Sequence, residues 1–153
     1  DEVPSRGLGD VYKRQLVTRV IRTKQGQAKN FMIVDAAMTE LVRPTLYGAH
    51  HDIGLVRQRD EKLLAWDVVG PVCESGDFLG LARELPELDP GALLAVFSAG
   101  AYGAVLGSSY NTRPAAPEVL VDGATHDVVR RRPSYADMLA GEKIPDWLNS
   151  LAD

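Results

Sequence analysis

Short apolar runs separated by turn residues constrain the fold of this chain more than any other feature. Runs rich in β-branched and aromatic residues predict strands at residues 16–23, 30–35, 55–59, 63–69, 93–97, 118–121 and 125–131. Gly, Pro and Asp punctuate the junctions, and Asp122-Gly123 is a strong two-residue hairpin signal. Many short strands at close spacing favour a mainly β chain, folded as a barrel or a sandwich.

Few segments have the periodicity of a helix. Residues 134–140 begin at an N-cap serine and end before a glycine, which predicts a short helix. Further short helices are expected around residues 78–83 and 101–106. Pro44 disfavours a helix that runs through Arg43.

The composition excludes several classes of protein. The chain has one cysteine among 153 residues, so it has no internal disulfide and suits a reducing cytoplasm. Its 45% hydrophobic residues can form a core, yet no window approaches the roughly 20 apolar residues of a membrane span. A net charge of −4 without a basic stripe gives no support for nucleic-acid binding. We therefore expect a cytoplasmic globular domain without a nucleic-acid or membrane partner.

Residues 1–15 differ from the rest of the chain. They have neither helical nor strand periodicity, and they lack the apolar region of a signal peptide. They resemble translated sequencing-adaptor sequence, so we expect a non-native, disordered leader without function. A natural disordered leader is the alternative. The rest of the chain, residues 16–153, is expected to form one β-domain.

A loop with the sequence GPVCESGD, residues 70–77, holds the single cysteine, Cys73, beside Glu74. A thiol there can deliver a proton, and the neighbouring carboxylate can hold an ammonium group. Lone cysteines are more often small buried hydrophobic residues, but the proline, the glycines and the polar neighbours indicate a loop. No histidine lies near Cys73 in the sequence, so a Cys–His hydrolase dyad has little support.

Two other segments add a cation and aromatic rings. Arg43 precedes a proline, and Tyr47 follows four residues later; Tyr102 lies among the small residues of SAGAYG, residues 98–103. A guanidinium binds a carboxylate as a bidentate fork, so Arg43 and Glu74 together can recognise a zwitterion if they share a pocket. The structural alternatives are a half-buried strand-end position for Tyr47 and tight corner packing around Tyr102.

No metal site is expected. His50 and His51 are adjacent, so on a strand their side chains point to opposite faces, and no spaced third ligand follows. The glycines lack the spacing of a phosphate loop. Three arginines at residues 130–132 are expected as a solvated strand end.

In order and chemistry these motifs resemble the diaminopimelate decarboxylases, which are pyridoxal-phosphate enzymes of the fold-type III superfamily that also includes alanine racemase and ornithine decarboxylase. The resemblance covers roughly residues 16–149. It rests on RPTLYGAH at 43–50, GPVCESGD at 70–77, AGAYG at 99–103 and SYNTRP at 109–114. It implies the mostly β C-terminal domain of such an enzyme, with the N-terminal (β/α)8 barrel and its Schiff-base lysine outside this sequence. It also implies a homodimer with active sites at the subunit interface.

The resemblance assigns roles to individual residues. Cys73 matches the proton donor, while Arg43, Tyr47 and Glu74 match substrate-binding positions. Tyr102 matches a residue that contacts both cofactor and substrate. The complete enzyme would convert meso-2,6-diaminopimelate to L-lysine and CO₂ with pyridoxal phosphate, and this chain alone is expected to be inactive.

Two alternatives stay open. One is a decarboxylase of another basic amino acid or of a carboxylated polyamine, although Glu rather than Asp after the cysteine favours diaminopimelate. The other is a non-catalytic β-barrel that binds a ligand or a partner.

Overall fold

The structure is a computed structural model that describes residues 14–149. It divides the chain into two compact units, the first ending at Asn111 and the second beginning at Thr112. The predicted leader lies outside the described residues, apart from Arg14 and Gln15, which lead into the first strand. In the part of the chain that the structure describes, no helix is long and apolar enough to cross a membrane.

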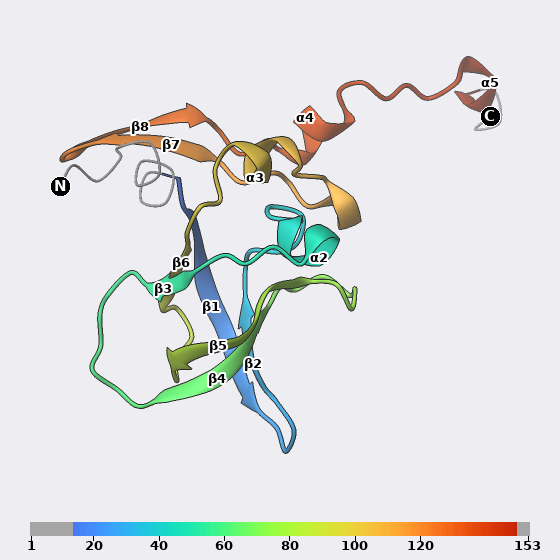
Figure 1. Ribbon diagram of the computed structural model, residues 1–153. Coiled ribbons are helices and arrows are strands. Elements are labelled where there is room, and N and C mark those ends of the chain that lie inside the picture. Colours follow the sequence, from blue (N-terminus) through green and yellow to red (C-terminus); the bar gives the residue numbers. More distant parts are fainter. Residues whose placement is uncertain (1–13, 150–153) are drawn as a thin grey trace. The chain divides into compact units, whose positions relative to one another are not determined.

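The first unit is a six-stranded sheet that curls into a nearly closed barrel (Figure 1). Its strands are β1 (Leu16–Gln25), β2 (Asn30–Val34), β3 (Ile53–Leu55), β4 (Leu63–Val69), β5 (Phe78–Pro86) and β6 (Leu93–Val96). They lie in the order β3-β6-β1-β2-β4-β5, and each neighbouring pair is antiparallel except the parallel pair of β2 and β4. A Cβ placed on Gly80 of β5 would lie 3.0 Å from Cδ1 of Ile53 on β3, so the two edge strands approach each other. The prediction of a mainly β, barrel-like domain with few short helices is confirmed.

Strand β1 joins the two halves of this barrel, which are the β3–β6 pair and the β2–β4–β5 group. Its first residues, 16–19, pair with β6, and residues 20–25 pair with β2. The register shifts between Val20 and Arg22, and an irregularity of this kind bends a strand. One long strand therefore serves both halves. The buried side chains between them include Trp66, whose Nε1 donates to the Leu85 carbonyl at 3.0 Å.

Two of the sequence predictions for this unit are wrong. Residues 78–83 form the start of β5 rather than a helix, because hydrogen bonding to β4 overrides a locally helical pattern of apolar residues. The strand expected at residues 55–59 lies earlier, at Ile53–Leu55, and residues 56–62 are an exposed polar loop. The other predicted strands lie within about two residues of the observed ones.

A buried carboxylate stabilises the irregular part of the β4–β5 pair. Asp67 accepts a hydrogen bond from Lys29 Nζ at 2.8 Å and another from the backbone N–H of Ala82 at 2.8 Å. Ala82 has a φ of 51°, which is uncommon for a residue other than glycine. Burial alone would raise the pKa of the Asp67 carboxyl, but the bonds from Lys29 and Ala82 outweigh it, and the pKa lies below its ordinary value of 3.8.

A lowered pKa makes Asp67 a source of stability above about pH 4, which is lost as the pH falls through the folded-state value. We expect Asp67→Asn to lower the free energy of unfolding by about 1–2 kcal/mol at pH 7, because the charged pair is lost while the Ala82 bond is kept. Urea unfolding of both proteins at pH 7 and at pH 3 measures the difference, which should shrink at the lower pH. A difference that is the same at both values would contradict this role.

The second unit contains a hairpin and two short helices: β7 (Glu118–Asp122), β8 (Thr125–Arg130), α4 (Tyr135–Leu139) and α5 (Asp146–Asn149). The hairpin is confirmed, but Asp122 pairs with Thr125, so the loop is Gly123-Ala124, one position later than expected. Gly123 has a φ of 57°, a conformation that glycine adopts without steric cost.

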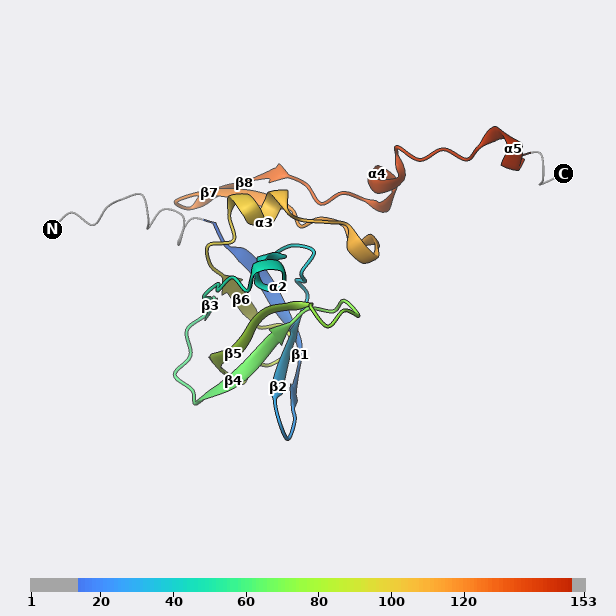
Figure 2. The same cartoon turned by 45° about the vertical axis from the view of Figure 1, so that its right-hand side comes forward.

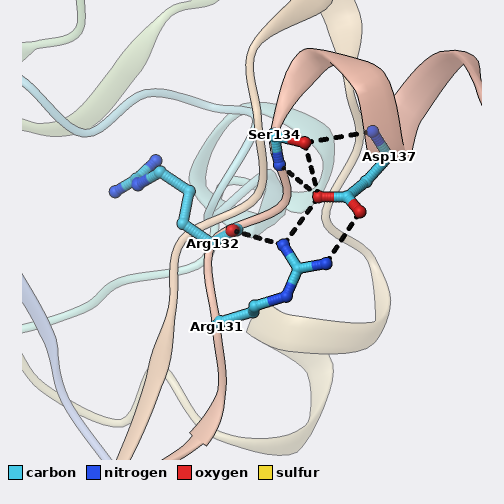
Figure 3. A network of polar contacts seen from close by, with 4 residues as sticks. All are labelled: Arg131, Arg132, Ser134 and Asp137. Atoms are coloured by element: carbon cyan, nitrogen blue, oxygen red, sulfur yellow. Dashed lines mark hydrogen bonds and ion pairs between the residues drawn. The ribbon is translucent and has the colours of Figure 1, made fainter.

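The predicted N-cap of α4 is part of a larger polar network (Figure 3). Ser134 Oγ accepts from the Asp137 backbone N–H, and the Asp137 carboxylate accepts from the Ser134 N–H, which together form a capping box. Arg131 adds a bidentate pair at 2.6 and 2.7 Å. These bonds, first from Arg131 and then from Ser134, hold the pKa of Asp137 well below its ordinary range. The side chains of the arginine run are solvated, as predicted.

Candidate functional site

The cysteine-bearing loop, residues 70–77, connects β4 to β5. Cys73 is exposed on this loop, as predicted, while the preceding Val72 is buried. The sulfur accepts a weak hydrogen bond from Nδ2 of Asn111, with a separation of 3.8 Å. Asn111 lies in a short 3-10 turn, Tyr110–Thr112, and has a φ of 56°. The loop therefore presents the thiol to solvent and to a residue that is 38 positions later in the chain.

The buried Asp77 makes hydrogen bonds that close this loop. Its side chain is 4% exposed, and its two oxygens accept from the backbone N–H groups of Met38 and Val72 at 2.6 and 2.7 Å. The Gly70 N–H donates to the Asp77 carbonyl at 3.1 Å, and a Cβ on Gly70 would collide with the Asp77 carboxylate. The loop is thus closed over a buried anion, and the glycine before it leaves room for that anion.

Helix α2 (Arg43–Tyr47) carries the candidate cation. The expectation that Pro44 excludes Arg43 from a helix is wrong, because the proline occupies the first turn, where its missing N–H has no partner to lose. Gly48 ends the helix with a φ of 61°. Tyr47 is 64% exposed on this helix, so it is not a half-buried residue at a strand end.

A direct contact ties α2 to the cysteine-bearing loop. Thr45 Oγ1 donates to the Gly76 carbonyl, and a Cβ on Gly76 would lie 2.7 Å from Cγ2 of Thr45. The backbone of the loop therefore packs on the side chain of the helix. Glu74 folds over the same loop, and its Oε1 accepts from Ser75 Oγ at 3.2 Å and from the Gly76 N–H at 3.3 Å. The Thr45–Gly76 contact thus joins the helix that carries Arg43 to the loop that carries Glu74.

Helix α3 (Ala101–Val105) brings Tyr102 to Arg43. The Arg43 Cζ lies 5.8 Å from the centroid of the Tyr102 ring, which is within the range of a cation–π contact. Gly103 is buried, and a Cβ on it would lie 3.4 Å from Leu41 Cδ1. The small residues around Tyr102 therefore permit close packing, while the ring itself is 66% exposed. The close packing expected around Tyr102 is therefore found at Gly103, and it leaves Tyr102 itself exposed.

Figures 1 and 2 show α2 and α3 beyond the same end of the strands, with the β1–β2 hairpin at the opposite end. Three described lysines of this unit lie elsewhere: Lys24 and Lys29 flank that hairpin, and Lys62 precedes β4. The segments that carry Cys73, Arg43 and Tyr102 contain no lysine. The site thus offers a thiol, a guanidinium, a carboxylate and exposed phenol rings.

The adjacent histidines lie just before β3 rather than on a strand, and they have different surroundings. His50 is exposed and contacts Asp52 at 3.0 Å and Arg83 at 2.8 Å. His51 is buried, and its Nδ1 lies 3.0 Å from the Phe97 carbonyl. Among residues 14–149, no group of three or more His, Cys, Asp or Glu side chains is arranged to hold a metal ion.

Comparison with known proteins identifies the domain. The family described as "Pyridoxal-dependent decarboxylase, C-terminal sheet domain" matches residues 14–100, more than half of the chain. The chain belongs to this decarboxylase family. The resemblance seen in the sequence motifs is confirmed.

Relatives of this pyridoxal-dependent decarboxylase domain include two curated diaminopimelate decarboxylases. The protein of Pseudomonas fluorescens is 53% identical over 129 residues, which are 84% of this chain and 31% of the relative. That of Archaeoglobus fulgidus is 47% identical over 134 residues, which are 87% of this chain and 32% of the relative. The crystal structure of the M. jannaschii diaminopimelate decarboxylase in complex with L-lysine matches with a TM-score of 0.82 and 32% identity, covering 88% of this chain and 31% of that one. The chain thus spans about a third of the length of these relatives.

Within this decarboxylase domain, all five predicted site residues lie on connected segments at one end of the barrel. Cys73 and Glu74 share the loop, Arg43 and Tyr47 lie on the helix tied to it, and Tyr102 contacts Arg43. Sequence reasoning missed three residues that contact these segments: Thr45, Asp77 and Asn111. For Asp77 and Thr45 a signal was present, because Gly70 leaves room for the Asp77 carboxylate and Gly76 for the Thr45 side chain.

Proposed function

We propose that this chain is the substrate-contacting C-terminal domain of a diaminopimelate decarboxylase. The observation that carries the proposal is the Thr45–Gly76 tie, which places a guanidinium-bearing helix beside a loop with an exposed thiol and a carboxylate. The similarity to diaminopimelate decarboxylases over most of the chain supports the same substrate. We assign residues 16–153 to this domain and residues 1–15 to a leader outside it.

Glu74 and Arg43 bind different groups of the substrate. Glu74 accepts from the ammonium group at the end of the substrate that does not react, and Arg43 binds the carboxylate beside it as a bidentate fork. The Tyr102 ring supports the guanidinium from its other side, and Tyr47 borders the same helix face. A substrate with an ammonium but no carboxylate at this end leaves Arg43 unpaired, which disfavours its binding.

The cofactor of the family is pyridoxal phosphate, which acts as an electron sink when CO₂ leaves the substrate. The exposed ring of Tyr102 fits a contact with such an aromatic group, but the site segments contain no lysine to hold it covalently. We place that lysine in a further domain of a longer polypeptide. After CO₂ has left, Cys73 Sγ gives its proton to the carbon that lost the carboxylate.

Two further features support a larger assembly. Five apolar side chains of the β7–β8 hairpin are between 49% and 65% exposed: Val119, Leu120, Val121, Val128 and Val129. A two-stranded hairpin with uncovered apolar side chains is marginally stable by itself. The outward-facing Cys73 is suited to a site shared across a subunit interface, so we propose a cytoplasmic homodimer.

A chimera tests the function. This chain replaces the corresponding third of the Pseudomonas fluorescens relative, and CO₂ release is measured with pyridoxal phosphate present. We expect turnover of meso-diaminopimelate by the chimera and none by the isolated 153-residue chain, because the isolated chain lacks a cofactor lysine at its site. Ornithine, lysine and arginine serve as comparison substrates. Turnover by the isolated chain, or preference of the chimera for one of these, would overturn the proposal.

A further inference from the structure

The carboxylate of Asp77 is buried, bonded at both oxygens, and not used by the chemistry proposed above. Oδ1 accepts from the Met38 N–H at 2.6 Å and Oδ2 from the Val72 N–H at 2.7 Å. Hydrogen bonds to an ionised acceptor are short and about twice as strong as neutral ones. One side chain therefore joins two backbone segments that are more than thirty residues apart in the sequence.

Each of these two segments leads to a residue of the site. Val72 directly precedes Cys73, so its N–H lies one residue before the thiol. Met38 begins the short segment that runs through Leu41 into α2 and Arg43. The Thr45–Gly76 contact joins the same two segments a second time, beside Asp77.

The Asp77 side chain has little freedom to move. The Asp77 N–H donates to the Glu74 carbonyl at 3.0 Å, and the Gly70 N–H donates to the Asp77 carbonyl. A side chain on Gly70 would collide with the carboxylate, so the loop closes directly against it. The position of the carboxylate thus fixes the loop on which the thiol is carried.

We infer that Asp77 is a positioning residue that fixes the Cys73 thiol relative to the Arg43 helix. The inference deepens the proposed function and rests on it for the role of Cys73. A displacement of about 1 Å at a reacting group can reduce a rate about 10²-fold. A rigid link between the two segments therefore maintains the rate by keeping the Cys73 thiol at a fixed distance from the substrate held by Arg43.

The first test uses this chain and needs no turnover. Asp77→Asn keeps the shape of the side chain but turns one acceptor into a donor that faces a backbone N–H. We expect hydrogen exchange to accelerate about tenfold or more at whichever of the Met38 and Val72 amides faces the new NH2 group, because its charge-assisted bond is lost. The other amide keeps a neutral bond to the remaining oxygen, so its exchange should accelerate less. The rate at which iodoacetamide alkylates Cys73 should change about threefold or more as the loop is released.

Two further variants separate positioning from general destabilisation. Asp67→Asn removes another buried charge of the same barrel without touching the loop. Alkylation of Cys73 should therefore stay at its wild-type rate, and exchange at Met38 and Val72 should accelerate no more than exchange at the other buried amides of the barrel, in proportion to the loss of global stability. Gly70→Ala keeps the Asp77 charge but forces the carboxylate to move, and it should reproduce the effects of Asp77→Asn. If Asp77→Asn does not fold, the exchange and alkylation measurements are made on Gly70→Ala instead.

In the chimera, Asp77→Asn should lower kcat about tenfold or more, whereas Asp67→Asn should leave it unchanged. Wild-type exchange at Met38 and Val72, wild-type alkylation of Cys73, or equal effects in Asp67→Asn would each overturn the inference. If the unsubstituted chimera is inactive while exchange and alkylation respond as expected, the positioning role stands and the proposed function fails.

Discussion

Replacing Cys73 with alanine in the chimera is expected to lower kcat for diaminopimelate by about 10²–10⁴-fold, the usual contribution of a positioned acid. The substitution removes the Sγ proton that the proposed mechanism delivers to carbon. Because Cys73 is exposed and, among residues 14–149, its sulfur has a weak hydrogen bond with Asn111, the fold should be nearly unaffected. Steady-state CO₂ release measures the rate, and thermal unfolding measures the fold.

Serine at position 73 is the matched control. It keeps the size of the side chain and a proton on it, but an alcohol is a much weaker acid than a thiol. We therefore expect Cys73→Ser to retain part of the activity lost in Cys73→Ala. Unchanged turnover in both variants would favour a β-barrel that binds a ligand or partner without taking part in the chemistry.

Local sequence signals predicted most of the strands and two of the short helices, α3 and α4. The β7–β8 hairpin and the N-cap of α4 depend on residues within a few positions of each other, and both were found. The prediction failed at β5, where pairing with β4 decides the conformation, and at α2, where a proline was compatible with the first turn. Long-range pairing carries little local signal, which explains the error at β5. The error at α2 is local, because a proline in the first turn of a helix costs no hydrogen bond.

In the candidate site, too, local signals were readable from the sequence and long-range contacts were not. Motifs suggested that Cys73, Arg43 and Tyr102 are functional, but no sequence pattern placed them at one end of the barrel. Their proximity depends on contacts between distant segments: Thr45 with Gly76, Asp77 with Met38, and Asn111 with Cys73. The side chains that position the site were therefore harder to predict than the side chains that carry the chemistry.

Arg43→Ala in the chimera is expected to lower kcat/KM for diaminopimelate by about 10²-fold or more, since two charge-assisted hydrogen bonds to the distal carboxylate are lost. L-lysine lacks that carboxylate, so the kcat/KM measured with L-lysine should change much less, and the preference for diaminopimelate should narrow. The two kcat/KM values, measured side by side, give the preference directly. Arg57→Ala removes an exposed arginine of the β3–β4 loop and serves as the control for a change of charge.

Substitutions of Tyr102, whose ring lies against Arg43, should reduce the preference for diaminopimelate by smaller amounts. Tyr102→Phe keeps the aromatic face on which the guanidinium lies, so its kcat/KM for diaminopimelate should change little. Tyr102→Leu removes that face, and its kcat/KM is expected to fall about threefold to thirtyfold. The Leu variant should therefore fall between the Phe variant and Arg43→Ala in its preference for diaminopimelate. If Arg43→Ala retained the full preference, recognition of the distal carboxylate would have to come from another residue, and the assignment of Arg43 would be wrong.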